Sequence, residues 1–242
     1  MPYASCGLPY YLAGRITEEE KLLITNPQKV KERFGIDARV GHEVRRIDRA
    51  NKQVEVVERE TGTQYALPYD KLILATGATP IVPPIEHVSA PNVFLLRTVE
   101  DSRKAHRWIE KHQPASAVVV GAGFIGLEVA EAVRERGLRV TVVEKADHAL
   151  PPLDAEMATT VADELAKHGV ELITGCGLKS MHAEDGLVTA VEVEDGRVVP
   201  ADIVVLAIGV RPNVALPHSR NTCATPVMAP SVRAPIAGRV PS

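Results

Sequence analysis

The chain has 242 residues, of which 45% are hydrophobic and 24% charged, and its formal net charge is −3 at pH 7. This composition is ordinary for a globular protein and excludes disorder over the whole length. The near-neutral charge predicts no nucleic-acid partner, and no apolar run approaches the roughly 20 residues that cross a bilayer. Three cysteines, at positions 6, 176 and 223, are too few and too scattered for a disulfide framework or a metal site. A reducing, cytoplasmic location is therefore expected.

The first hundred residues predict short elements separated by turns. Residues 27–36 are expected to form a short helix that ends at a glycine. Alternating apolar residues over 38–67 predict a small antiparallel hairpin. Residues 71–75 predict a short apolar strand, and the prolines at 80, 83, 84 and 91 mark a connector without regular structure.

From residue 99 onward, strands and helices alternate with short connections, which predicts a parallel α/β unit. Runs of valine and isoleucine suit strands that are covered on both faces. The expected order is helix 99–111, strand 117–120, helix 127–136, strand 139–143, helix 155–168, strand 170–173, a meander over 187–199 and a buried strand 203–208. Residues 217–242 contain five prolines and no apolar period, so we expect an irregular or disordered tail.

The most informative motif is a glycine-rich turn that follows an apolar strand and opens a helix. The turn consists of Gly121, Ala122, Gly123, Phe124, Ile125 and Gly126. In a G-x-G-x-x-G turn, the first glycine permits the bend, the second lets the backbone approach a diphosphate, and the third lets the helix pack closely on the strand. The motif therefore predicts a dinucleotide site; the alternative is a turn that serves packing alone.

Glu144 ends the second strand of this unit, 18 residues after Gly126. A carboxylate at this place accepts hydrogen bonds from a ribose diol. It favours NAD over NADP, because a 2′-phosphate would meet a like charge. The neighbouring Lys145 could tolerate that phosphate, so both coenzymes stay open, with NADH favoured.

Cys6 lies in the segment SCGLPYY at 5–11. A helix beginning just after it would raise the thiolate fraction through the helix dipole. Since no second cysteine lies in the next several residues, any redox role would pass through a mixed disulfide, a sulfenic acid or a persulfide. The alternative, an inert small apolar residue, is the interpretation for Cys176 and Cys223.

Four blocks of sequence together resemble the FAD-dependent pyridine nucleotide–disulfide oxidoreductases. They are SCGLPYY at 5–11, YDKLILATGATP at 69–80, VVVGAGFIGLEVAE at 118–131 and ADIVVLAIGVRPN at 201–213. The resemblance is to the single-cysteine subgroup, which contains coenzyme A-disulfide reductase, NADH oxidase and peroxidase, and persulfide reductase. It implies a three-layer Rossmann-like α/β fold, with a partial FAD-binding domain over 1–98, an NAD(P)-binding domain over 99–216 and the tail over 217–242.

The resemblance also assigns roles to single residues. Cys6 would be the redox-active nucleophile beside the flavin, and Glu128 would lie near the nicotinamide and the flavin. Phe124 would be an aromatic gate over the flavin face. The other implied contacts are Val44, Ala75, Thr76, Gly77 and Arg97 for FAD and Gly209 for the NAD site. As alternatives, Glu128 could complement the helix dipole from the first turn, and Arg97 could be a solvated loop residue.

By this resemblance, NADH or NADPH reduces FAD, and FAD reduces coenzyme A disulfide, a persulfide or a peroxide at Cys6. Family members are homodimers with an initial FAD-binding unit and a final dimerisation domain, and we expect both segments to be missing from this chain. Two alternatives stay open. One is a nucleotide-binding module with little or no catalysis, and the other is an NAD dehydrogenase with a single cofactor.

Overall fold

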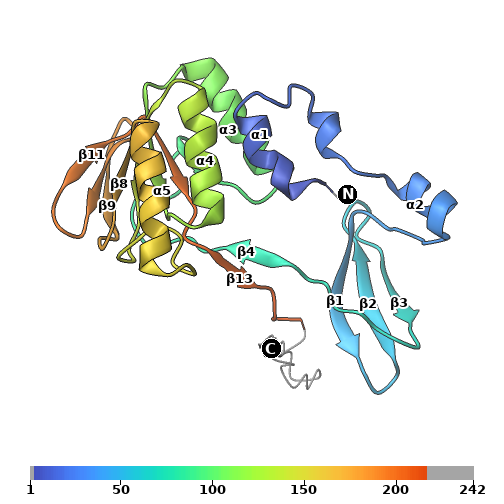
Figure 1. Ribbon diagram of the computed structural model, residues 1–242. Helices are drawn as coiled ribbons and strands as arrows, with labels where there is room; N and C mark the ends of the chain where they lie inside the picture. Colours follow the sequence, from blue (N-terminus) through green and yellow to red (C-terminus); the bar gives the residue numbers. More distant parts are fainter. Residues whose placement is uncertain (1–2, 217–242) are drawn as a thin grey trace, which may run out of the picture. The chain divides into compact units, whose positions relative to one another are not determined.

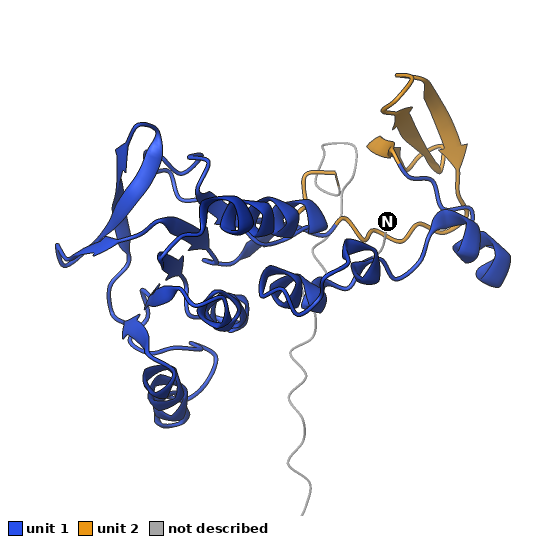
Figure 2. Cartoon of the chain, turned by 90° about the horizontal axis from the view of Figure 1, so that it is seen from above, with its two compact units in different colours: residues 1–40, 77–212 blue, residues 41–76, 213–242 orange. Residues whose placement is uncertain are grey.

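The computed structural model describes residues 3–216 and divides them into two compact units (Figure 1, Figure 2). Unit 1 comprises residues 3–40 and 77–212, and unit 2 comprises residues 41–76 and 213–216. The tail over 217–242, with Cys223, lies outside the described residues. These units are defined by packing, whereas the predicted domains are defined by the cofactor that each would bind. Residues 77–98 belong to unit 1, and the predicted domain division at 98 and 216 stays a prediction.

Unit 1 is built on a five-stranded parallel sheet with the strand order β5–β12–β6–β7–β8. The strands are β5 (Val93–Leu95), β6 (Ser116–Val120), β7 (Arg139–Val143), β8 (Val170–Ile173) and β12 (Ile203–Leu206). All five residues of β6 are buried, as its run of valines predicts for a central strand. Val120 at the end of β6 pairs with Leu206 on one side and Val143 on the other, so three carboxyl ends meet at one edge.

Helices cover one face of this sheet. They are α1 (Leu8–Leu12), α3 (Val99–His112), α4 (Phe124–Glu135) and α5 (Ala155–Lys167). Alternate strand residues such as Val119 and Val142 pack against Val129 and Val133 of α4 in one apolar cluster. The predicted helices are confirmed, but α4 begins three residues earlier than expected, at Phe124.

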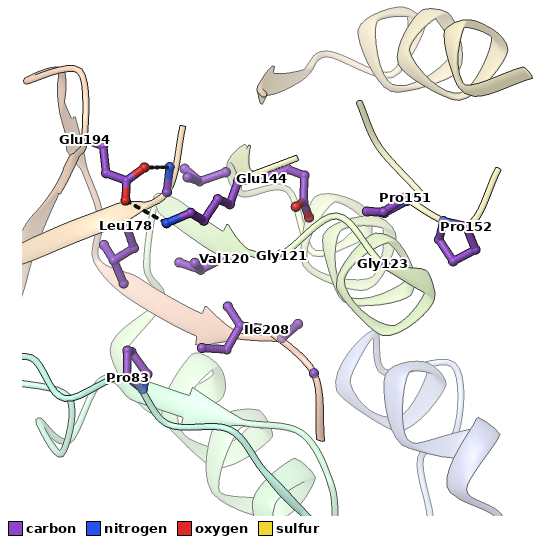
Figure 3. A pocket seen from close by; sticks show the side chains of 15 residues that line it. Pro83, Val120, Gly121, Gly123, Glu144, Pro151, Pro152, Leu178, Glu194 and Ile208 are labelled. Carbon is purple, nitrogen blue, oxygen red and sulfur yellow. Dashed lines mark hydrogen bonds and ion pairs between the residues drawn. The ribbon is translucent and has the colours of Figure 1, made fainter. Parts of the chain in front are cut away.

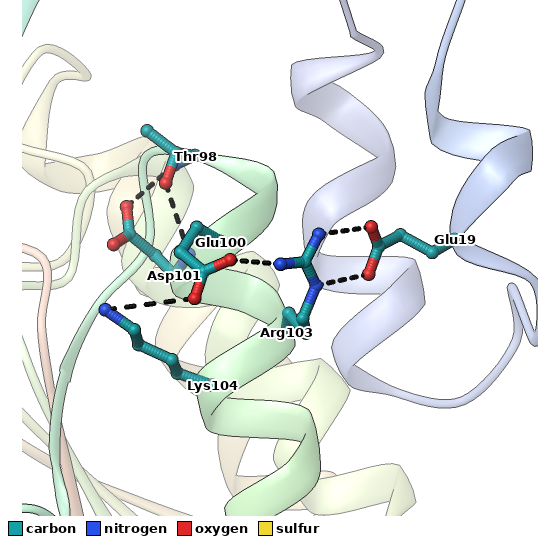
Figure 4. Close-up of polar contacts among 6 residues, drawn as sticks. All are labelled: Glu19, Thr98, Glu100, Asp101, Arg103 and Lys104. Atoms are coloured by element: carbon teal, nitrogen blue, oxygen red, sulfur yellow. Dashed lines mark hydrogen bonds and ion pairs between the residues drawn. The ribbon is translucent and has the colours of Figure 1, made fainter. Parts of the chain in front are cut away.

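A polar clamp joins α3 to the short 3₁₀ helix η2 (Glu19–Leu22), as Figure 4 shows. The α3 N-terminus carries a capping box, in which the Thr98 hydroxyl accepts the Asp101 N–H and the Asp101 carboxylate accepts the Thr98 N–H. One turn further on, Arg103 donates through Nε to Glu19 at 2.6 Å and also bonds Glu100. The clamp fixes an N-terminal segment to the helical layer.

An antiparallel sheet covers the other face of the parallel sheet. It has the order β11–β10–β9 and consists of β9 (Leu178–Glu184), β10 (Leu187–Val193) and β11 (Val198–Pro200). Val191 and Met181 pack against Val118 in a second apolar cluster. The sequence predicts β10 and β11 as a meander but misses β9. Helices, parallel sheet and antiparallel sheet make three layers, and the predicted α/β class is confirmed.

Unit 2 is an antiparallel sheet of three strands rather than the expected hairpin of two. The strands are β1 (His42–Asp48), β2 (Gln53–Glu58) and β3 (Gln64–Pro68), in that order. Ile47, Val54 and Val56 form its small core with Tyr65 and Leu67.

The strand predicted over residues 71–75 does not form, so this prediction is wrong. These residues belong to none of the sheets in the described part of the chain, and the Ile73 side chain is 90% exposed. An apolar run becomes a strand only when a neighbouring strand takes up its backbone hydrogen bonds.

The remaining elements are the 3₁₀ helix η1 (Ser5–Gly7), α2 (Pro27–Phe34) and the pair β4 (Ala78–Pro80) and β13 (Val210–Pro212), which is antiparallel. The predicted helix at 27–36 is confirmed as α2. The Asn26 side chain caps its start, and Gly35, at φ +67°, ends it. Within residues 3–216, no helix has both the length and the apolar character that crossing a membrane requires.

Candidate nucleotide-binding site

A cleft of about 630 Å³ opens at the carboxyl edge of the parallel sheet (Figure 3). Its walls come from the ends of β6, β7 and β12 and from loops beyond them. Five of the predicted cofactor residues line it, namely Gly121, Gly123, Glu144, Lys145 and Gly209. Residues that the sequence analysis misses also line it, among them Pro83, Pro151, Gly177, Glu194 and Ile208.

Two glycines of the turn are required by backbone packing. Gly121 has φ +106°, and its N–H donates to the Val143 carbonyl at 2.7 Å. A Cβ on Gly121 would lie 2.5 Å from the Ala207 carbonyl oxygen, and one on Gly126 would lie 1.9 Å from the Gly121 oxygen. Neither contact is possible without moving the main chain. These two glycines therefore bring β6, β12 and the start of α4 together.

Backbone packing does not require glycine at position 123. Its φ of −77° and ψ of −178° suit any residue, and a Cβ there would have no neighbour within 4 Å. It lines the cleft and is the N-cap of α4, which no side chain caps. The first N–H groups of a helix favour an anion. The free space and these N–H groups together fit the diphosphate of a dinucleotide.

Glu144 joins the end of β7 to the glycine turn. Its Oε2 accepts the Ala122 N–H at 2.6 Å, and its Oε1 accepts the Ala146 N–H at 2.8 Å. An ionised carboxylate has about four lone-pair positions, so two remain for further donors. The oriented carboxylate at the cleft wall is suited to the two hydroxyl groups of a ribose.

Lys145 lies next to a second carboxylate. Its Nζ is 3.0 Å from Oε1 of Glu194, whose Oε2 accepts the Gly177 N–H at 2.9 Å (Figure 3). The Gly177 N–H, and after it Lys145, hold the pKa of Glu194 below its ordinary value. Glu194 is thus a stable anion at the wall of the cleft at neutral pH.

Residues 1–225 match the family model described as pyridine nucleotide-disulphide oxidoreductase. The chain belongs to this family. The membership that the four sequence blocks predict is confirmed, and FAD and NAD(H) are the family's cofactors.

Three similar proteins illustrate the family. An NADH oxidase from Methanocaldococcus jannaschii is 38% identical over 215 residues, which are 88% of this chain and 47% of that protein. The crystal structure of reduced Bacillus anthracis CoADR-RHD has a TM-score of 0.84 at 41% identity, over 89% of this chain and 38% of that one. The NAD-dependent persulfide reductase from A. fulgidus has a TM-score of 0.82 at 37% identity, over 88% and 39%. The chain spans about half the length of the curated relatives that it matches.

Several predicted site residues lie away from the cleft. Ala122 is buried beneath it, whereas Phe124 and Ile125 are 65% and 44% exposed. Glu128 is exposed and lines a groove between α4 and α5 instead of the cleft. Because α4 begins at Phe124, Glu128 lies in its second turn, and the alternative of a first-turn carboxylate is wrong.

The two described cysteines have different environments. Cys6 is exposed in η1, just before α1, and α1 packs against α3 and α4. The expected helix after Cys6 does form, but it has only five residues. Cys176 is buried, and its Sγ accepts the Asp195 N–H at 3.2 Å, as suits a packing role.

The predicted flavin contacts are divided between the two units. Gly77 and Arg97 both belong to unit 1, where a Cβ on Gly77 would lie 4.0 Å from Nη2 of Arg97. Val44, Ala75 and Thr76 belong to unit 2, and all three are exposed. The Thr76 hydroxyl donates to the Asn213 carbonyl at 2.6 Å. A shared role of these residues in FAD binding stays a prediction.

Proposed function

We propose that the cleft binds NADH, and that the chain is the coenzyme-binding portion of a flavin-dependent NAD(P)H oxidoreductase. The observation that supports this most strongly is the open space at Gly123 beside the uncapped start of α4. A diphosphate there would accept hydrogen bonds from main-chain N–H groups and lie at the positive end of the helix dipole. A side chain at residue 123 would occupy part of this space.

The other walls of the cleft suit the remaining parts of the coenzyme. Glu144 would accept hydrogen bonds from the adenosine ribose, because its carboxylate is already oriented by Ala122 and Ala146. Gly209 follows β12 and would line the NAD site, as the family resemblance implies, and Ile208 precedes it in the same cleft wall.

We also propose that the substrate is a small disulfide, persulfide or peroxide. The relatives named coenzyme A disulfide reductase and persulfide reductase support the disulfide and persulfide members of this class. FAD, when bound, accepts hydride from the coenzyme and passes an electron pair to sulfur. For a disulfide the balance is NADH + H⁺ + R–S–S–R → NAD⁺ + 2 R–SH. The exposed Cys6, as a thiolate, would attack one sulfur of the substrate, break its S–S bond, form a mixed disulfide with that sulfur and release the other half, which takes up a proton as R–SH. The two electrons that NADH supplies would then cleave the mixed disulfide, which releases the second R–SH and returns Cys6 to its thiolate. A homodimeric state and a cytoplasmic location stay predictions.

Two measurements on the purified chain test this function. Its visible spectrum reports bound flavin, and NADH oxidation is followed with a disulfide, a persulfide or a peroxide as acceptor. We expect Cys6→Ser to abolish turnover while NADH binding, measured by calorimetry, stays unchanged. Ser5→Ala, at the exposed neighbouring position, is the matched control and should keep full turnover. Full turnover by Cys6→Ser would remove Cys6 from the mechanism.

A nucleotide-binding module without catalysis is the second candidate. It is favoured by one observation, that unit 1 forms the whole coenzyme cleft from its own residues. A colourless protein that binds NADH and oxidises none of it would support this candidate.

A further inference from the structure

We infer that Glu194 makes the cleft select NADH over NADPH, by pairing with Lys145 and by adding a second carboxylate to the cleft wall that also contains Glu144. This inference rests on the proposed function, since it concerns the coenzyme that the same cleft takes. From the sequence alone, Glu144 favours NAD, but both coenzymes stay open because the neighbouring Lys145 could tolerate a 2′-phosphate. The ion pair with Glu194 engages the Lys145 ammonium group and so opposes its contact with a 2′-phosphate.

Glu194 is held in place by main-chain geometry. It follows β10, and its own N–H donates to the Gly177 carbonyl at 2.9 Å while its Oε2 accepts the Gly177 N–H. A Cβ on Gly177 would lie 3.0 Å from the Glu194 carboxylate carbon, so the glycine leaves room for this close approach. The carboxylate is thereby held at the wall of the cleft.

Lys145 is the only cation among the described residues that line the cleft. Its Nζ lies 3.0 Å from Glu194, and Glu144 lies beside it in the chain. The wall of the cleft therefore carries two carboxylates and one ammonium group. A 2′-phosphate, which brings nearly two further negative charges, is repelled there, whereas a neutral ribose diol is not.

A purely structural role for the Glu194 side chain makes a different prediction. In Glu194→Gln, the main-chain bond to Gly177 and an oxygen that accepts the Gly177 N–H are both retained. The variant therefore removes charge and leaves the hairpin anchored. If Glu194 acted only as an anchor, this variant would leave the balance between the two coenzymes unchanged.

The experiment is a calorimetric titration of the full chain with NADH and with NADPH at low ionic strength. We expect the wild type to prefer NADH, and Glu194→Gln to bind NADPH about threefold to fivefold more tightly with NADH affinity nearly unchanged. Adding Lys145→Gln to this variant should abolish the gain, because the released ammonium group supplies it. The gain should also shrink as salt is added.

The matched control is Glu192→Gln on the same hairpin. Glu192 lies 2.7 Å from Lys179, and neither residue lines the cleft, so this variant should leave the coenzyme ratio unchanged. An unchanged ratio in Glu194→Gln would overturn the inference while NADH binding by the wild type still supports the proposed function. A wild type that binds NADPH as tightly as NADH would also overturn the inference. If the wild type binds no NADH, the proposed function fails and the inference fails with it.

Discussion

The Glu144 carboxylate accepts the Ala122 N–H at 2.6 Å, which ties the end of β7 to the glycine turn after β6. Ala122 is fully buried, so this bond satisfies a main-chain donor that water does not reach. The same carboxylate therefore completes the fold of the turn and faces the cleft. Replacing Glu144 should therefore affect both NADH binding and stability, and each effect has its own measurement.

Glu144→Ala should weaken NADH binding by at least about tenfold, because hydrogen bonds to a charged group contribute about 1.5–3 kcal/mol. It should also lower the free energy of unfolding by about 1–3 kcal/mol, because the Ala122 N–H loses its acceptor. Calorimetry and urea denaturation measure the two effects. Glu171→Ala is the control, since Glu171 bonds Thr141 outside the cleft. Unchanged NADH affinity in Glu144→Ala would contradict the ribose assignment.

Gly126→Ala should destabilise the protein, because its methyl group would lie 1.9 Å from the Gly121 oxygen. Shifting main chain in a packed turn costs about 1–3 kcal/mol. Urea denaturation gives the change in the free energy of unfolding. The matched variant is Gly123→Ala, whose methyl group has no neighbour within 4 Å and should change stability by less than about 0.5 kcal/mol. Equal stability of the two variants would show that the close approach of α4 to the turn is not present.

The clamp between Glu19 and Arg103 should make stability depend on pH. The Arg103 guanidinium holds the pKa of Glu19 below its ordinary value of 4.5. A lowered pKa in the folded state contributes stability that is fully present above about pH 4.5 and is lost as the pH falls through the lowered value.

Glu19→Gln should therefore have a lower melting temperature than the wild type at pH 7, and the difference should narrow as the pH falls below 4.5. Melting curves from pH 7 down to acid measure it. Glu18→Gln, which loses only an exposed pair with Lys21, is the control and should show a smaller difference. A Glu19→Gln difference that persists in acid would mean that the ion pair is not its source.

The local sequence pattern predicts most of the strands and helices of the parallel α/β unit. The bounds of β7 and β8 agree with the sequence prediction, because each is a short, mainly apolar segment between two helix signals and is visible within a few residues. The sequence pattern predicts the start of α4 three residues too late, because the glycine turn and the helix share Phe124 and Ile125. Local signals mark elements better than they mark boundaries.

What the sequence could not predict depends on contacts between distant residues. Residues 71–75 have the composition of a strand, but composition does not supply a pairing strand. Likewise, nothing near Glu194 indicates that it meets Lys145 or that Gly177 leaves room for it. The glycine turn and Glu144 were predictable because the spacing of that motif is local, whereas Pro83 and Ile208 reach the same cleft through the tertiary fold.

The most direct test of the account is a calorimetric titration of NADH into the wild type and Gly123→Val. The valine side chain fits the backbone conformation of residue 123 but occupies the space assigned to the diphosphate. The account predicts saturable NADH binding by the wild type and at least about tenfold weaker binding by the variant, equivalent to about 1.4 kcal/mol, with an unchanged melting temperature. Equal NADH affinity of the two proteins, or no binding by the wild type, would contradict it.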